Sequence, residues 1–303
     1  MQKSDIARLL FLAALWGASF MFMRIASPAF GAINTAFLRV FFGFCGLATI
    51  LLVMRGSFRF DGKMKQVLLL GVINSGIPFL MYCIAAQLLP AGYSAILNAT
   101  TPMMGVMIGA LFFAEALTLK KSAGVVTGLL GIILITTTGN ASEAHILLPG
   151  IVCCLIATAC YGVAGFLTRR WINQRGGLDA RTLAMGSQLG ATLFLLPFFI
   201  GSLTTGPQVQ WGQSEAWLSV LAVGFLCTAA AYIFYFHLVA SIGPLRSLTV
   251  TFLIPPFGVL WGWLFLDEAL PGSFFIGAAV ICLAVWLVIT PSRAERANQP
   301  QVK

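Results

Sequence analysis

Ten apolar segments of about 20 residues follow one another along the chain, with short polar joints between them. A helix of ~20 residues crosses a hydrocarbon core of roughly 30 Å. A membrane β-barrel would instead alternate apolar and polar residues with a period of two, and these segments are unbroken. The sequence therefore predicts an all-α integral membrane protein with transmembrane helices at residues 6–26, 32–54, 66–88, 93–113, 122–138, 148–168, 180–201, 216–237, 245–266 and 273–290.

Composition supports this prediction and excludes several other classes of protein. Of the 303 residues, 59% are hydrophobic and 9% are charged, which is too few charges for the surface of a soluble domain. The net charge of +9 does not indicate a nucleic-acid partner, because the basic residues lie in the joints and form no basic face. All seven cysteines lie inside apolar segments, and with two histidines we expect no disulfides, metal or cofactor.

The positions of Lys and Arg predict how the chain is oriented. With both termini in the cytoplasm, all but two of the 18 basic residues fall on the cytoplasmic side. Short loops of membrane proteins strongly follow this bias. The two exceptions, Arg24 and Arg39, lie within predicted helices.

An internal repeat divides the chain into two halves. Residues 82–137 align with residues 235–290 without a gap, and the matches include two tyrosines, two prolines, two glutamates and several glycines. Because each half would contain five helices, the second half enters the membrane with the opposite polarity. Inverted repeats around a central cavity are common in transporters that work by alternating access. The predicted units are a first repeat at 1–142, an inverted second repeat at 143–291 and a cytoplasmic tail at 292–303.

Several paired motifs resemble the EamA-type branch of the drug/metabolite transporter superfamily. They are Trp16-Gly17 in the first segment, Arg39 in the second, Pro102 followed by Glu115-Ala116-Leu117-Thr118, and Pro255 followed by Glu268-Ala269-Leu270-Pro271. The resemblance covers nearly the whole chain. It implies a bundle of ten helices around a central cavity, in a family whose members often export amino acids or other metabolites across the bacterial inner membrane.

Arg39 is the most informative charged residue, because a guanidinium within a membrane helix usually faces the bundle interior or water. Arg39 either binds a substrate carboxylate, which its planar fork suits, or clamps neighbouring helices through their backbone carbonyls. The sequence favours the clamp, because the family carries Arg at this position with many substrates. Arg24 lies near the end of its helix, where we expect its side chain to extend to the membrane surface.

Polar and amphipathic side chains inside the apolar segments are candidates for the cavity wall, because an amide facing lipid is costly. Asn98 and Gln188 are the strongest of them. For tyrosines near the ends of helices, the alternative is a position at the membrane–water interface, outside the cavity. The predicted substrate-binding residues are Trp16, Ser19, Arg39, Tyr82, Asn98, Tyr161, Gln188, Tyr232 and Tyr235.

Pro102, Pro255 and Pro256 are predicted hinges, because proline removes a backbone hydrogen bond and kinks a helix. A static bend is the alternative. Glu115 and Glu268 end the fourth and ninth helices at opposite membrane faces and are predicted polar gates. Alternatively, Glu115 neutralises the nearby lysines and Glu268 accepts hydrogen bonds within a tight turn.

These features predict a transporter of small metabolites, most simply an exporter or facilitator of amino acids or related compounds. Efflux of drugs or aromatic compounds, and proton-coupled antiport, are the alternatives. None of the nine acidic residues lies near the centre of a predicted helix, which disfavours coupling through a deep carboxylate. The chain contains no catalytic motif, so we do not expect an enzyme, and a sensor or scaffold is the remaining class. Its expected partners are a small-molecule substrate and the lipid bilayer. We expect the protein to be a monomer, with a homodimer as the alternative.

Overall fold

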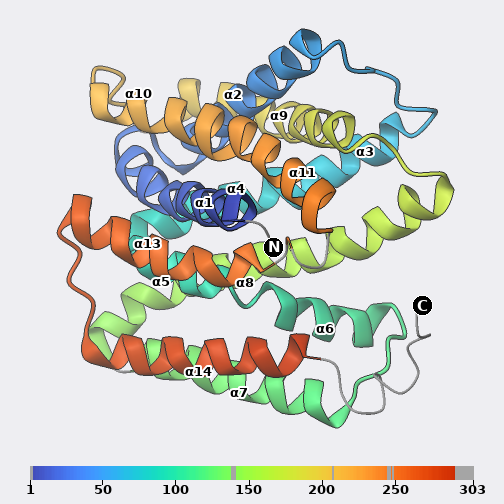
Figure 1. The fold of residues 1–303 in the computed structure, drawn as a ribbon. Coiled ribbons are helices and arrows are strands. Elements are labelled where there is room, and N and C mark those ends of the chain that lie inside the picture. The colour runs from blue at the N-terminus through green and yellow to red at the C-terminus, as the bar shows by residue number, and fades with distance from the viewer. Residues whose placement is uncertain (1–2, 138–140, 207, 244–246, 248, 291–303) are drawn as a thin grey trace.

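A computed structural model describes residues 3–137, 141–206, 208–243, 247 and 249–290 (Figure 1). These residues form helices and loops, without β-strands. The predicted tail at 292–303 lies outside the described residues. The helical elements are α1 (Lys3–Phe30), α2 (Ala32–Val53), α3 (Met64–Gly71), η1 (Val72–Gly76), α4 (Ile77–Leu88), α5 (Ala91–Asn98), α6 (Thr101–Phe112), α7 (Leu119–Thr137), α8 (Ala141–Trp171), η2 (Asn173–Arg175), α9 (Ala180–Thr205), α10 (Ser214–Leu221), η3 (Ala222–Ala230), α11 (Ala231–Ile242), α13 (Val250–Leu266) and α14 (Gly272–Ile289).

The all-helical membrane prediction is confirmed, and helices occupy each of the ten predicted segments. Within the described residues, eight helical stretches are long and apolar enough to cross a membrane, and the bent pair α5–α6 makes nine. The helix α13 is apolar but has only 17 residues. The count of ten spans therefore stays a prediction.

Two segments wind as π-helices, each in the middle of a long helical stretch. The segment η1 joins α3 to α4, where Pro78 offers no N–H to the carbonyl of Asn74. The segment η3 joins α10 to α11, where the Thr228 hydroxyl donates a hydrogen bond of 2.8 Å to the Val223 carbonyl. Short π segments often occur at functional sites. At the spacing of the internal repeat, η1 coincides with part of η3.

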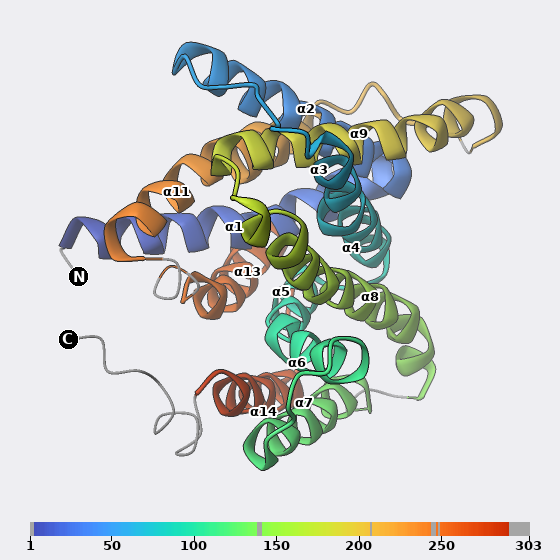
Figure 2. The same cartoon turned by 90° about the vertical axis from the view of Figure 1, so that its right-hand side faces the viewer.

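The helices α7 and α14 form a separate layer at one edge of the molecule, where they run side by side in opposite directions (Figures 1 and 2). Glycines let their backbones approach closely. A Cβ atom added to Gly131 would lie 2.8 Å from Ile281, and one added to Gly277 would lie 2.5 Å from Ile135. The main apolar core, between α1, α2, α4, α5, α8, α9 and α13, extends into this layer through residues such as Ile135 of α7 and Ile281 of α14.

The connection from α6 to α7 and the connection from α13 to α14 lie at opposite ends of the bundle (Figure 1). Glu115 belongs to the first connection and Glu268 to the second. The predicted gate residues are therefore separated by the thickness of the helical bundle, as opposite membrane faces would require.

Candidate substrate cavity

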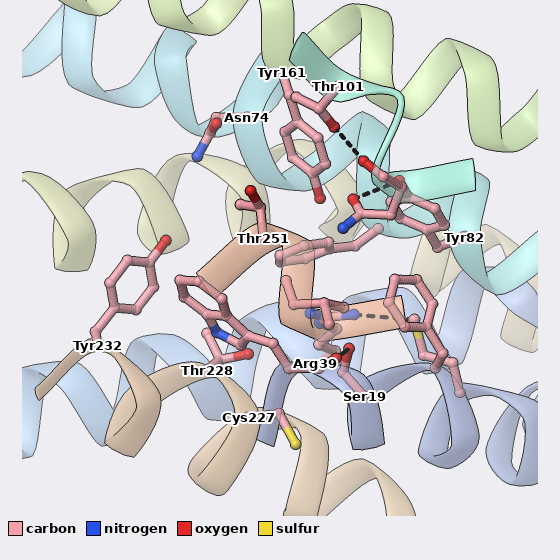
Figure 3. Close-up of a pocket in the computed structure, with 16 residues that line it drawn as sticks. Ser19, Arg39, Asn74, Tyr82, Thr101, Tyr161, Cys227, Thr228, Tyr232 and Thr251 are labelled. Carbon is pink, nitrogen blue, oxygen red and sulfur yellow. Dashed lines mark hydrogen bonds between the residues drawn. The ribbon is translucent and has the colours of Figure 1, made fainter. Parts of the chain in front are cut away.

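A cavity of about 240 Å³ lies between the helices, with α1, α2, α4, α8, α13 and both π segments contributing to its wall. Figure 3 shows Tyr161 and Thr101 approaching it from above and Tyr232 from the left, with Arg39 below. Seven of the nine predicted substrate-binding residues line it: Trp16, Ser19, Arg39, Tyr82, Asn98, Tyr161 and Tyr232.

Arg39, on α2, is 94% buried, since 6% of its surface is exposed. Its guanidinium carbon lies 3.6 Å from the centre of the Phe79 ring, and one terminal nitrogen donates to the Met23 sulfur at 3.0 Å. Among the described residues, its Nε has no hydrogen-bond partner and no backbone carbonyl accepts from it. The carbonyl clamp that the sequence favoured is therefore wrong for this conformation. A thioether and a ring leave most of the guanidinium's hydrogen-bonding capacity unused.

Asn98 and Tyr82 form a polar pair on the wall. The Tyr82 hydroxyl donates a hydrogen bond of 2.9 Å to Asn98 Oδ1, and the rings of Tyr82 and Tyr161 stack with their centres 6.3 Å apart. Asn98 is the last residue of α5, and its carbonyl accepts a hydrogen bond of 2.7 Å from the Thr101 hydroxyl. In an uninterrupted helix that carbonyl would accept from residue 102, but Pro102 has no N–H.

Gln188 and Tyr235 do not line the cavity, in contrast to the prediction. Gln188 is fully buried on α9, and its amide nitrogen donates to the Ser75 hydroxyl at 3.0 Å. Its side-chain oxygen is buried without a hydrogen-bond partner among the described residues. A polar residue inside a bundle can bond to a neighbouring helix instead of lining a cavity, and the sequence alone does not distinguish the two cases. Tyr235 packs against Trp16 with ring centres 5.7 Å apart, one layer behind the wall.

The predicted substrate-binding set leaves out nine wall residues, most of them apolar or only weakly polar. A threonine or phenylalanine inside an apolar segment is ordinary packing material, so its type carries no signal. The two π segments supply three of the nine. The nine are Phe20, Met23, Asn74, Phe79, Thr101, Cys227, Thr228, Thr251 and Ile254.

Among the described residues that line the cavity, Arg39 alone carries a charge, and none is Asp, Glu, Lys or His. Burying an unpaired cation is costly, and such groups normally acquire a partner. The titratable groups that act electrostatically on Arg39 are the phenols of Tyr161 and Tyr232 and the thiols of Cys83 and Cys227, and no carboxylate of a described residue is among them. The site can therefore accept an anionic group.

Arg24 and Glu268 form an ion pair at the predicted periplasmic end. Arg24 Nε lies 3.4 Å from a Glu268 oxygen, and the two side chains are 33% and 12% exposed. Arg24 also donates to the Ala86 carbonyl at 2.7 Å, and the Ala91 N–H donates to Glu268 at 2.8 Å. The Arg24 side chain, which was expected to extend to the membrane surface, is thus bonded to Glu268 and Ala86 at this end of the bundle. Burial raises the pKa of the Glu268 carboxyl, opposed by the Ala91 N–H and Arg24.

Glu115 and Arg169 form the corresponding pair at the predicted cytoplasmic end. Their closest atoms are 3.7 Å apart, and the side chains are 51% and 66% exposed. An exposed pair of this length contributes little stability. At the spacing of the repeat Glu115 matches Glu268. Near the starts of the halves, Trp16-Gly17 matches Tyr161-Gly162, and Arg24 and Arg169 each lie eight residues after the aromatic residue. Each ion pair thus joins a glutamate of one half to an arginine of the other.

The helices that precede the two glutamates end with the same backbone geometry. The residue before each has a positive φ, of 53° at Ala114 and 50° at Asp267. The N–H of Glu115 donates to the Gly109 carbonyl at 3.0 Å, and that of Glu268 donates to the Gly262 carbonyl at 3.2 Å. Each carboxylate is thereby turned back towards its own helix.

The predicted hinge prolines occupy different settings. Pro102 follows a break where α5 and α6 meet at 43°, with two residues between the helices. Pro255 and Pro256 lie inside α13, which continues through both. The expected symmetric interruption is therefore found only at Pro102. Pro255 and Pro256 are the sixth and seventh residues of α13, so the carbonyls they leave without a donor belong to its first turn.

Comparison with known proteins agrees with this architecture. The EamA-like transporter family matches residues 6–137 and 148–290. A "Probable amino-acid metabolite efflux pump" of Escherichia coli is 22% identical, and the alignment covers 98% of each chain. A "Probable terminal-alkyne amino-acid exporter" of Streptantibioticus cattleyicolor is 26% identical over 70% of this chain and 69% of its own.

A solved crystal structure has the same fold, with a TM-score of 0.62 at 18% identity, covering 99% of this chain and 100% of the other. The sequence resemblance to the EamA-type branch is thus confirmed. With a family match across most of its length and helices that can span a bilayer, this chain belongs to the EamA-like transporter family and is a multi-pass membrane transporter of small molecules.

Proposed function

We propose that this protein exports amino acids or related organic compounds across the bacterial inner membrane by alternating access. The observation that carries the proposal is the central cavity, whose wall combines one buried guanidinium with hydroxyl, amide and aromatic groups. Such convergence of a few polar groups in a largely apolar pocket is typical of small-molecule sites. The names of the relatives from Escherichia coli and Streptantibioticus cattleyicolor support export and amino-acid-like cargo.

The two ion pairs are the proposed gates, and the repeats at 1–142 and 143–291 are the proposed moving units. In this conformation the Arg24–Glu268 pair is largely buried, whereas the Glu115–Arg169 pair is loose and exposed. The described conformation would therefore be closed towards the periplasm. When the two halves exchange conformations, the Glu115–Arg169 pair would close and the Arg24–Glu268 pair would open. Pro102 would serve as the hinge of the first half.

Efflux of aromatic compounds is the second candidate, favoured by the rings of Trp16, Phe20, Phe79, Tyr161 and Tyr232 around the cavity. A proton-coupled antiporter has less support, because the described part of the cavity wall contains no carboxylate. The two candidates share one cavity and differ in cargo, so the same transport assay separates them.

Counterflow of labelled solutes in proteoliposomes tests the proposal. Vesicles loaded with unlabelled amino acids are expected to accumulate the matching labelled compound only when they contain the protein. Accumulation of aromatic drugs alone would favour the second candidate. No accumulation across amino acids, organic acids and aromatic drugs would contradict transport through this cavity and favour a sensor or scaffold.

Asn98→Ala is expected to reduce the counterflow rate about fivefold, because one hydrogen bond to a substrate or to Tyr82 is worth ~1 kcal/mol. Thr127→Ala is the matched control, since Thr127 lies exposed on α7 and bonds only to its own helix. The rates are compared at equal amounts of inserted protein. Equal rates for the two variants would remove Asn98 from the site.

A further inference from the structure

We propose that the cavity selects substrates that carry a net negative charge, with a carboxylate on Arg39 and an apolar or aromatic body. This inference rests on the proposed function and names its substrate class. A carboxylic acid without a compensating amine would therefore be a better cargo than the zwitterionic amino acid of the same shape.

The first step is the state of Arg39 itself. The side chain is 94% buried, and its Nε has no hydrogen-bond partner among the described residues. Its contact with Met23 is to a sulfur, which is a weak acceptor that a carboxylate oxygen can displace. The two terminal nitrogens together form a fork that binds a carboxylate end-on through two parallel hydrogen bonds, once the carboxylate has displaced the Met23 sulfur.

The second step is the Phe79 ring, which fixes the orientation of that fork. The guanidinium carbon lies 3.6 Å from the ring centre, so the cation rests on the aromatic ring. A carboxylate can then approach without the arginine having to be ordered first, which removes part of the entropic cost of binding.

The third step is the charge balance of the filled cavity. The wall residues carry one positive charge and no negative charge. A monoanion brings the sum to zero, whereas a zwitterion leaves it at plus one and must place its ammonium near the same walls. The Asn98 side-chain oxygen already accepts the Tyr82 hydroxyl, and no described wall residue carries a carboxylate that would neutralise an ammonium. In a buried site of low dielectric, a difference of one unit charge has a large effect on the electrostatic free energy of binding.

The fourth step is size. An engineered protein cavity of about 150 Å³ holds benzene. A cavity of about 240 Å³ accordingly has room for one aromatic ring with a short acidic side chain. The rings of Trp16, Tyr161 and Tyr232 would contact such a body.

The test uses four compounds that share one body and differ in charge: 3-phenylpropionate, phenylalanine, 3-phenylpropanamide and 2-phenylethylamine. Binding to the purified full-length protein is measured by calorimetry. We expect 3-phenylpropionate to bind about tenfold or more tightly than each of the others, as expected for a charge-assisted bidentate pair. Phenylalanine binding as tightly as 3-phenylpropionate would overturn the inference.

Variants assign the preference to the named residue. Arg39→Gln is expected to weaken the binding of 3-phenylpropionate about tenfold and to change the affinity for the neutral amide by less than about twofold. Arg39→Lys keeps the charge without the fork and should retain a reduced preference for the acid. Asn98→Asp adds a negative charge to the wall and should raise the affinity for phenylalanine relative to the affinity for 3-phenylpropionate. An unchanged order of affinities in Arg39→Gln and in Asn98→Asp would overturn the inference.

The two proposals fail in different ways. If phenylalanine is both bound and transported in preference to the acid, the substrate class is wrong and the transport proposal stands. If 3-phenylpropionate binds as expected but no solute undergoes counterflow, the substrate class stands and the transport proposal is wrong. If none of the four compounds binds, the substrate class is overturned, and counterflow of other solutes then decides the proposed function.

Discussion

Glu268→Gln is expected to slow transport about tenfold and to open the predicted periplasmic side of the cavity. Glutamine can still accept the Ala91 N–H, but it removes the charge that holds Arg24. The loss of one partner from a buried pair costs roughly 3–5 kcal/mol, and partial exposure of Arg24 reduces this to on the order of 1–3 kcal/mol. A free energy of that size shifts a two-state equilibrium by about tenfold or more.

Cys227 provides the measurement, because this native thiol lines the cavity and is 1% exposed. With the other cysteines replaced by serine, a membrane-impermeant maleimide is added from the periplasmic side. Labelling should be slow in the parent and about tenfold faster in Glu268→Gln. Glu115→Gln is the matched control, since it makes the same change in the exposed pair, and its labelling should not exceed that of the parent. Equal labelling of both variants would contradict the gate assignment.

Gly190→Ala is expected to lower the melting temperature by several degrees. A Cβ atom added to Gly190, on α9, would clash with the Leu68 carbonyl oxygen of α3, and one added to Gly71, on α3, would clash with the Ser187 carbonyl oxygen of α9. Backbone atoms cannot move aside as a flexible side chain does, so the two helices must separate. Such overpacking costs about 1–3 kcal/mol or more, which is roughly 2–4 °C for each kcal/mol in a large domain.

Gly201→Ala tests whether the effect comes from the contact or from the loss of a glycine. Gly201 is on the same helix, and an added Cβ would meet no atom within 4 Å. Alanine at an unobstructed helical position is favourable by about 0.5–1 kcal/mol, so the melting temperature should stay equal or rise. Thermal unfolding of both purified variants in the same detergent gives the comparison, and a similar loss in both would refute the close packing of α3 and α9.

The membrane architecture was predictable because lipid imposes a simple physical filter. Helices must be apolar over a fixed length, and short basic loops stay in the cytoplasm. These two rules located the helical segments. They say less about interruptions within a helix, so the break between α5 and α6 and the two π segments could not be read from hydrophobicity. Pro102 indicated the break between α5 and α6, whereas Pro255 and Pro256 predicted a break in α13 that the structure does not have.

The cavity was partly predictable for a different reason. Arg39 and Asn98 are too polar to face lipid, so their presence in apolar segments indicated the interior. The same reasoning predicted Gln188, which is interior but bonds to Ser75 instead of lining the cavity. Thr228 and Phe79 could not be found at all, because only the packing of helices determines which faces meet.

The partners of the charged residues were also beyond the sequence. Arg24 and Glu268 are 244 positions apart, and their contact depends on the first and ninth helical segments meeting at one end of the bundle. The repeat matched Glu115 to Glu268 through identical neighbours, but it did not indicate that each would face an arginine from the opposite half.

The charge of Arg39 ties the proposed transport cycle to the membrane potential. An empty cavity carries one positive charge, which is more stable when it faces the negative, cytoplasmic side of an energised membrane. That field is worth at most about 2.3 kcal/mol per charge for each 100 mV. A bound monoanion cancels the charge, so the loaded protein crosses without opposing voltage. Respiration would thereby return the unloaded carrier to the cytoplasm, and export would acquire direction without a proton site in the cavity.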